Sequence, residues 1–312
     1  MTIGVCGSYL VFVGSSISTL VNVYDTMQWL TPDICTILVT IPIIFLSWLR
    51  SYKFLVPTSQ LGLVALIFAL SVTIYYSIND ILTNNNSRNI STLNDYDLYN
   101  INNYPLFLGN AAFLYLIHSV ILPVEQHMKH RPRRVLTKGF TKALNIGIGL
   151  VTILNLIFSE WVYFAYGNNV CGNVIDNLTD GILKSIVKIL LSIDLFFTYA
   201  LFLFPTSEAL EREIFNPDKF GEFKEELKRN ILRGILVILT MGIALLVPSF
   251  EHLTGLTGAF GNNLLGFILP PLMYIKLYPI KSKLPIYTKI FGCCISIFGI
   301  IMLFVCTYFF IH

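Results

Sequence analysis

The chain has 312 residues, of which 55% are hydrophobic and only 12% are charged, and its formal net charge is +3. Soluble domains carry about 25% charged residues, so this composition excludes a water-soluble globular protein. The basic residues form no continuous patch along the chain, which argues against nucleic-acid binding.

Nine apolar stretches follow one another along the chain, each near the roughly 20 residues that a helix needs to cross a bilayer. We predict helices, because an isolated apolar strand would leave its backbone groups unpaired in lipid. The predicted spans are 3–23, 34–49, 59–78, 106–124, 141–163, 182–204, 231–248, 254–275 and 288–311. The sequence therefore predicts an all-α polytopic membrane protein with a single transmembrane domain over residues 1–312.

The first stretch, MTIGVCGSYLVFVGSSISTLV, has no basic start, so we interpret it as a span rather than a signal peptide. Four of the six cysteines lie inside apolar stretches, where we expect them to act as small hydrophobic residues. No CxxC motif or Cys/His spacing indicates a metal or redox site, and we expect no cofactor.

Lysines and arginines gather in four loops that alternate with loops poor in them. The positive-inside rule makes the basic loops cytoplasmic, including 125–140 and 205–230, and it places the N-terminus in the cytoplasm. Loop 205–230 mixes both signs of charge. We interpret it as a short surface helix with a turn at Asn216–Pro217, and a partner-docking motif is the alternative.

The opposite loops carry the features of an outer face. Residues 79–105 are polar and rich in asparagine, and we predict a flexible outer loop. The three Asn-x-Ser/Thr sequons begin at Asn85, Asn89 and Asn177, which are candidate glycosylation sites. Cys35 and Cys171 also fall on this side, and a disulfide between them is a candidate in an oxidising compartment.

Two ionisable residues lie within predicted spans, where such groups are candidates for function. His118 is either a proton carrier or substrate ligand, or a histidine bonded between helices. Asp194 lies near the middle of its span. It either titrates during transport or pairs with Thr198 one turn on, and a protonated acid held by a hydroxyl group is the alternative.

Several motifs then occur in a familiar order. YPLFLGNAAF at 104–113 and VILPVEQHMKHRPR at 120–133 are followed by LLSIDLFFTYALFLFP at 190–205 and LLVPSFEHLTGLTGAFGNNLLGFILPPL at 245–272. This ordered set resembles the amino acid/auxin permease family, especially its proton-coupled amino-acid transporter branch. The resemblance spans essentially the whole chain.

The resemblance implies a LeuT-type bundle, an inverted repeat of about eleven helices. The nine spans here match the third through the eleventh, so the resemblance implies that the first two, with half of the substrate site, are lacking. The family breaks its sixth helix at Phe-Glu-Gly, where this chain has Tyr115-Leu116-Ile117. Leucine and isoleucine tolerate an intact helix, so we expect the break to move or weaken.

Resemblance of their helices to pocket-lining ones gives the candidate substrate-binding residues, which are Tyr9, Phe113, Tyr115, His118, Ser119, Thr198 and Tyr199. For the aromatic residues, packing between helices is the alternative. His118 and Asp194 are the candidates for proton coupling. Glycines recur between Gly255 and Gly266, where small residues permit close helix contact or, alternatively, flexibility for gating.

The resemblance implies a secondary active transporter of small neutral amino acids, driven by protons and working by alternating access in the plasma membrane or a lysosomal or vacuolar membrane. The alternatives are a non-transporting amino-acid sensor or binding protein, and an incomplete fragment of a transporter. We do not expect an enzyme, because no nucleophile–base pair or metal constellation is evident. The expected partners are amino acids, protons and the lipid bilayer.

Overall fold

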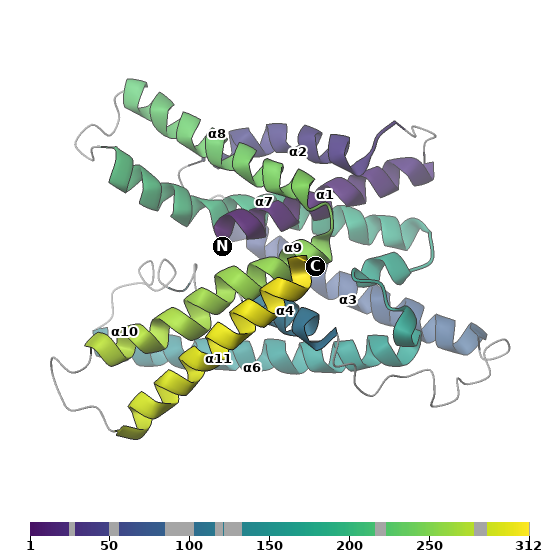
Figure 1. Cartoon of the computed structure of the whole chain (residues 1–312). Coiled ribbons are helices and arrows are strands. Elements are labelled where there is room, and N and C mark those ends of the chain that lie inside the picture. The colour runs from purple at the N-terminus through teal and green to yellow at the C-terminus, as the bar shows by residue number, and fades with distance from the viewer. Residues whose placement is uncertain are drawn as a thin grey trace. The chain divides into compact units, whose positions relative to one another are not determined.

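The computed structural model describes residues 1–24, 29–49, 56–84, 103–115, 121, 133–215, 223–277 and 286–311. Within these ranges all regular elements are helical (Figure 1), and six helices are long and apolar enough to cross a membrane. Two shorter apolar helices, Pro32–Ser47 and Tyr104–Leu114, accompany them. The prediction of an all-α polytopic membrane protein is therefore confirmed.

The bounds of the helices are α1 Thr2–Tyr24, α2 Pro32–Ser47, α3 Val56–Asn84, α4 Tyr104–Leu114, α6 Arg133–Tyr166, α7 Ile182–Ile214, α8 Phe223–Leu246, α9 Phe250–Thr257, α10 Leu269–Leu277 and α11 Ile286–Ile311. Each predicted span overlaps helical structure, but α4 ends before its span does, and α3, α6, α7 and α8 begin earlier or end later than theirs. Two wide π-helical turns, η7 (Gly258–Asn262) and η8 (Leu264–Ile268), lie between α9 and α10, and two short 3₁₀ turns, η4 (Gly167–Asn169) and η5 (Val174–Asn177), precede α7.

Helix α7 is longer than the sequence pattern indicates. It continues through Pro205 to Ile214, so the first part of the predicted loop 205–230 is a direct extension of the helix rather than a separate surface helix. The predicted turn at Asn216–Pro217 lies outside the described residues. The extension matters because it places charged residues of this segment against neighbouring helices.

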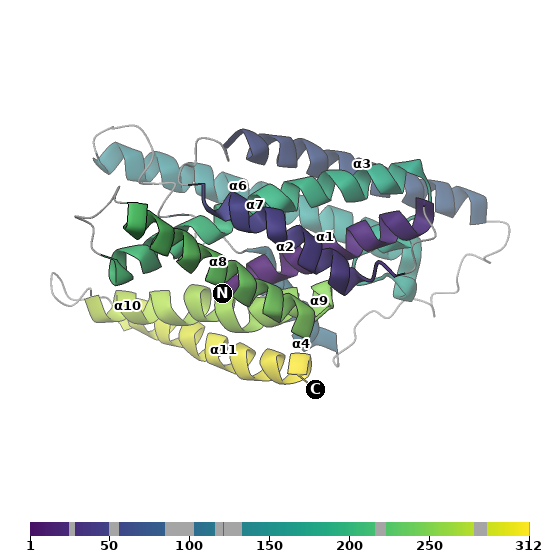
Figure 2. The same cartoon turned by 90° about the horizontal axis from the view of Figure 1, so that it is seen from above.

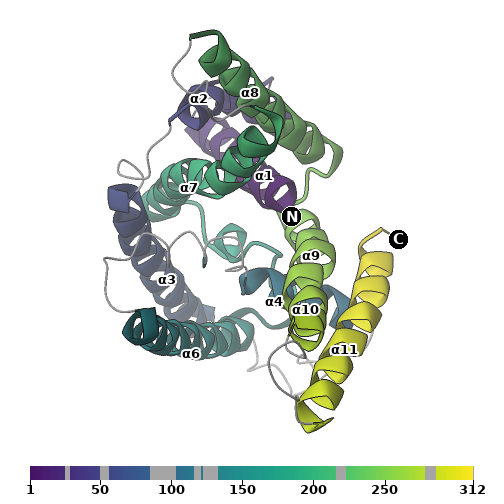
Figure 3. The ribbon, with the colours of Figure 1, turned by 90° about the vertical axis from the view of Figure 1, so that its left-hand side faces the viewer.

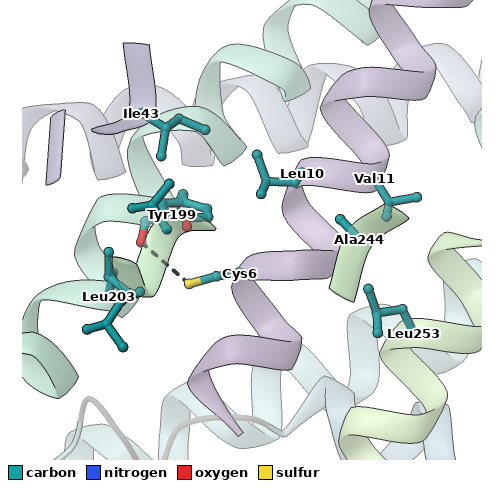
Figure 4. Close-up of a cluster of buried hydrophobic side chains, with 10 residues drawn as sticks. Cys6, Leu10, Val11, Ile43, Tyr199, Leu203, Ala244 and Leu253 are labelled. Carbon is teal, nitrogen blue, oxygen red and sulfur yellow. Dashed lines mark hydrogen bonds between the residues drawn. The ribbon is translucent and has the colours of Figure 1, made fainter. Parts of the chain in front are cut away.

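The chain forms two compact units. The first consists of Met1–Leu55, Asn100–Val120 and Leu195–His312. In it α1 packs against α2, α8 and α9, and α2 also contacts α8 (Figure 3). Its core cluster joins α1, α2, α7, α8 and α9 (Figure 4) and consists of Cys6, Leu10, Val11, Ile43, Tyr199, Leu203, Leu236, Val237, Ala244 and Leu253.

The second unit consists of Val56–Tyr99 and Ile121–Asp194 and therefore contains α3, α6 and the first part of α7. Helices α3 and α6 run alongside each other in it (Figure 2). Four buried positions of α3 recur at helical spacing and carry small side chains, namely Ala65, Ala69, Thr73 and Ser77, and Val72 is buried beside them. Small residues permit close approach of helices in a membrane, so this stripe is the packing face of α3.

Candidate functional site

Helix α4 ends within the predicted span 106–124. Its last residue is Leu114, and Tyr115 leaves the helical conformation with φ −92° and ψ 34°. Eleven residues of helix are about 16 Å long, roughly half the thickness of the hydrocarbon layer. The last helical residue thus directly precedes Tyr115-Leu116-Ile117, where the resemblance places the family's break.

The end of α4 is bound by a side chain from the π-helical turns. A helix leaves its last four carbonyl groups without partners inside the helix. The Asn262 amide donates a hydrogen bond to one of them, the carbonyl of Ala112. Its neighbour Asn263 donates to the carbonyl of Gly299 in α11 at 2.9 Å. Both asparagines are buried, so this pair links the end of α4 to α11.

Glycines bring α9 and η7 close to α4. A Cβ atom added to Gly258 would overlap the carbonyl of Gly109 and lie 2.7 Å from the amide nitrogen of Phe113. Thr254 also donates a hydrogen bond to Asn110 Oδ1 at 2.9 Å. These contacts favour close packing as the role of this part of the glycine-rich segment.

Tyr199, a predicted substrate-binding residue, lies in the core cluster (Figure 4) and is fully buried. Its hydroxyl group is 2.5 Å from Thr240 Oγ1. Thr240 donates its single hydroxyl hydrogen to the carbonyl of Val237 at 2.7 Å, so Tyr199 is the donor to Thr240. Cys6 Sγ lies 3.9 Å from the carbonyl oxygen of Tyr199. The side chain joins α7 to α8.

The other predicted substrate-binding residues lie in two separate parts of the structure or outside the described residues. Tyr9 packs edge-on against Phe202, with ring centroids 6.0 Å apart. Phe113 and Tyr115 are half-buried at the end of α4, and Thr198 is half-buried on α7. His118 and Ser119 lie outside the described residues, so the predicted roles of these residues in substrate binding stay predictions.

Asp194 lies about 18 Å along α7 from its beginning at Ile182, close to the middle of a membrane span. Its side chain is half-buried and lies against Gly62 of α3, which belongs to the same unit. A Cβ atom added to Gly62 would overlap Asp194 Oδ1. The carboxyl group therefore occupies the space that the missing side chain of Gly62 leaves open.

A second carboxyl group of α7 lies in a buried ionic cluster, Glu211–Arg229–Arg233. Arg233 donates from Nε to Glu211 Oε1 at 2.5 Å, and Arg229 lies 3.7 Å from Glu211 Oε2. Each of the three side chains is at most 4% exposed. Arg233 also donates to the carbonyl groups of Ser47 and Leu49 at the end of α2, at 2.8 and 3.0 Å. One cluster thus fixes the ends of α2 and α7 to α8.

Sequence reasoning missed this cluster, because charges near a predicted loop indicate a solvated surface. The sequence nevertheless contains one indication of this cluster. Arg229 and Arg233 are four residues apart and lie on one face of α8. The Arg229 and Arg233 guanidinium groups also lie over the rings of Phe215 and Phe204, with 5.6 and 5.5 Å to the ring centroids.

Lys184 and Lys188, in the first two turns of α7, pair with acids of the preceding segment. Buried Lys188 lies 3.0 Å from Asp176 Oδ1, and Lys184 lies 3.0 Å from Asp180 Oδ1. The hydrogen bond from Lys184 and its positive charge lower the pKa of Asp180 below its ordinary value. These pairs hold the segment before α7 against the helix.

The sequon residue Asn177 lies in the same segment, in η5, and its Oδ1 accepts a hydrogen bond from the backbone of Cys171 at 2.8 Å. Asn85 and Asn89 lie outside the described residues. Cys35 is buried and Cys171 is exposed, and both are free thiols here. They belong to different units, and their pairing stays a prediction.

Comparison with known proteins places this architecture among transporters. Residues 1–312 match the family described as transmembrane amino acid transporter protein. The chain is 26% identical over 309 residues to amino acid transporter AVT3A of Arabidopsis thaliana, covering 99% of this chain and 67% of that protein. It is 29% identical over 171 residues to amino acid transporter AVT3C of the same plant, covering 55% and 36%.

A relative from an animal is similar over much of the chain. The proton-coupled amino acid transporter-like protein pathetic of Drosophila melanogaster is 27% identical over 277 residues, covering 86% of this chain and 54% of that protein. The chain thus spans no more than about two thirds of the length of these three relatives.

Proposed function

The chain belongs to the transmembrane amino acid transporter family, and from this membership we propose that it carries small neutral amino acids across a membrane by proton-coupled, alternating-access transport. The observation that carries the proposal is the short helix α4, which ends at Leu114 within the predicted span 106–124. Discontinuous helices form the substrate and ion sites of many secondary transporters, because their free backbone groups can bind the cargo. The half-buried aromatic residues Phe113 and Tyr115 lie at this break and would line the substrate site.

Asp194 is the proposed proton carrier among the described residues. It lies near the middle of its span, where translocon scales put the cost of a carboxylate at about 2.5–3.5 kcal/mol. The carboxyl group would take up a proton from the more acidic side and release it on the other side as the protein changes conformation. Similarity to the Drosophila relative, a proton-coupled amino acid transporter-like protein, supports proton coupling. His118 is the second candidate.

Uptake by purified protein in lipid vesicles tests the proposal. We expect wild-type protein to accumulate labelled alanine or glycine when the vesicle exterior is acidic. Asp194→Asn should lose this pH-driven accumulation, because the asparagine amide does not titrate and cannot carry the proton. Glu208→Gln is the matched control, since it removes a carboxylate from the same helix at an exposed pair with Arg212. Equal pH dependence in Asp194→Asn and wild type would remove Asp194 from the mechanism.

A non-transporting amino-acid sensor or binding protein is the second candidate function. The presence of Tyr115-Leu116-Ile117 where the family has Phe-Glu-Gly favours it, because the glycine that permits unwinding of the helix is replaced. Binding of labelled alanine to the purified protein, together with no uptake into vesicles under any pH gradient, would select this function.

We also propose an orientation with the N-terminus in the cytoplasm, in the plasma membrane or a lysosomal or vacuolar membrane. The concentration of lysine and arginine in alternate loops supports this orientation. Asn177 would then face the glycosylating side. Loss of a glycan-dependent mass shift in Asn177→Gln, with the other two sequons already removed, tests it. Glycosylation engineered into the 125–140 loop would contradict it.

A further inference from the structure

The three cysteines of α11 lie in two different environments. Cys306 is fully buried and packs with Ala259 and Met302 in a small core cluster, as expected of a cysteine that acts as a small hydrophobic residue. Cys293 and Cys294, in contrast, are exposed free thiols. Cysteine is among the residues most often fully buried, so packing in a core does not account for two adjacent exposed ones.

The packing of α11 against α10 directs these two thiols outward. The two helices run beside each other (Figure 1). A Cβ atom added to Gly292 would lie 3.0 Å from Ile275 Cδ1 of α10, and Ser296, one turn further along α11, is buried. Successive residues of a helix are about 100° apart, so Cys293 and Cys294 follow Gly292 by about 100° and 200° around the helix. Both therefore lie on faces of α11 that are turned away from α10.

The surface around the two thiols is apolar and exposed. Ile290 lies one turn before Cys294, Ile297 and Phe298 lie one turn after the two cysteines, and all three are exposed. Helix α11 is long and apolar enough to cross a membrane. An exposed apolar face on such a helix is a lipid-facing one, because lipid tails are as apolar as these side chains. The two thiols are thus accessible from the bilayer.

Lysines indicate how deep the cysteines lie. Lys289 is exposed on α11 one turn before Cys293, about 6 Å along the helix and on the same face. A lysine near the end of a span extends its charged group to the interface, so Cys293 lies only about one turn below the membrane surface. Lys276, Lys281 and Lys283 precede α11 and make this loop one of the basic loops, which the proposed orientation places in the cytoplasm.

We propose that Cys293 and Cys294 form an S-acylation site for a long-chain fatty acid. Cysteines close to the membrane boundary are acceptors of reversible palmitoylation. The inference goes beyond the proposed function but rests on the proposed orientation, because the acyl donor is a cytoplasmic long-chain acyl-CoA. The attached chain would lie beside α11 among the lipid tails of the cytoplasmic leaflet.

The reaction is an exchange of thioesters. The cysteine sulfur attacks the thioester carbonyl of the acyl-CoA, and a carbon–sulfur bond to the protein forms while the bond to the CoA sulfur breaks. The proton of the cysteine thiol passes to the released CoA thiolate. Nothing is oxidised or reduced, so no further reactant is needed.

Acyl exchange on the full chain, produced in cultured eukaryotic cells, tests the proposal. Free thiols are blocked with N-ethylmaleimide, thioesters are cleaved with neutral hydroxylamine, and each released thiol is tagged with a polyethylene glycol maleimide that adds a visible mass step. We expect hydroxylamine-dependent steps in wild type and none in Cys293→Ser/Cys294→Ser. Cys171→Ser is the matched control and should keep the wild-type pattern, because it removes an exposed cysteine that the proposed orientation places on the opposite side.

The proposal is overturned if wild type shows no hydroxylamine-dependent step or if the steps persist in the double variant. Steps that require a reductant instead of hydroxylamine also overturn it, because they indicate a disulfide. If the double variant is not produced, mass spectrometry of the wild-type tryptic peptide that follows Lys289 decides. An acyl group on Cys293 or Cys294 supports the proposal, and its absence or its location on Cys306 overturns it.

The outcome is independent of amino-acid transport, so failure of the proposed function is recognised separately, by the uptake assay. Failure of the proposed orientation is also distinguishable. A glycan attached to a site engineered into the 125–140 loop would overturn the orientation and the acylation site together, whereas missing mass steps without such a glycan would overturn the acylation site alone.

Discussion

Helix α7 carries two carboxyl groups within helix contacts, and their surroundings differ. Glu211 lies between Arg229 and Arg233, which also bind the end of α2. Asp194 lies against the backbone of a glycine in α3. The carboxylate of Glu211 is held by two guanidinium groups and fixes three helices in one arrangement, whereas Asp194 lies against a position of α3 that has no side chain. The comparison sets a structural acid beside the proposed proton carrier on the same helix.

Glu211→Gln should have the largest effect on stability. The substitution leaves two buried arginines without their counter-charge, and such removal costs about 3–5 kcal/mol. We expect a large fall in the midpoint of thermal unfolding, measured on purified protein in detergent by size-exclusion chromatography after heating. Glu208→Gln, in a pair whose acid is 41% exposed and whose arginine is 74% exposed, should change stability by about 0.5 kcal/mol or less. Equal losses of stability in Glu211→Gln and Glu208→Gln would contradict a structural role for the buried cluster.

Asp176→Asn should have an intermediate effect. Its partner Lys188 is 4% exposed, but Asp176 itself is 48% exposed, so water reaches one side of the pair. We expect a loss of about 1–2 kcal/mol, between the values for exposed and buried pairs. The same heating assay measures it. A loss of stability as large as that of Glu211→Gln would mean that the solvent exposure of the acid does not determine how much the ion pair contributes to stability.

Asp180→Asn should have the smallest effect, and the effect should depend on pH. The folded protein lowers the pKa of Asp180 below its ordinary value of 3.8, chiefly through the hydrogen bond from Lys184. A lowered pKa adds stability above the ordinary value, and this stability disappears as the pH falls through the folded-state pKa. Wild type and variant should therefore differ slightly at pH 7 and converge below pH 3.8. A difference that grows on acidification would contradict the assignment.

The sequence predicts the helices well because a segment that crosses lipid must be a long apolar stretch. Such a stretch forms a helix, in which the backbone groups make their hydrogen bonds within the segment. The sequence does not predict the helix ends that are determined by packing against other helices. Pro205 interrupts an apolar run, yet α7 continues to Ile214, because contacts with α8 bury Glu211 on the extension. Similarly, the helix propensity of Leu116 and Ile117 gives no sign that α4 ends at Leu114, near the Ala112 carbonyl group to which Asn262 donates a hydrogen bond.

For the candidate site, the sequence identifies Asp194 by its chemistry, because a carboxylate within a span is rare. It gives no information on Gly62, since the two residues are far apart in the chain and meet only through the packing of α3 on α7. Tyr199 illustrates the opposite case. An aromatic residue at helical spacing fits a pocket or a core equally well, and only the hydrogen bond to Thr240 places it between helices.

The measurement that tests the central proposal most directly follows protons and amino acid in the same vesicles. Purified wild-type protein is reconstituted with a pH-sensitive dye inside, and alanine is added outside without an imposed gradient. Proton-coupled transport predicts acidification of the interior that depends on alanine and is lost in Asp194→Asn. Uptake or binding of alanine with no change of internal pH would contradict the account.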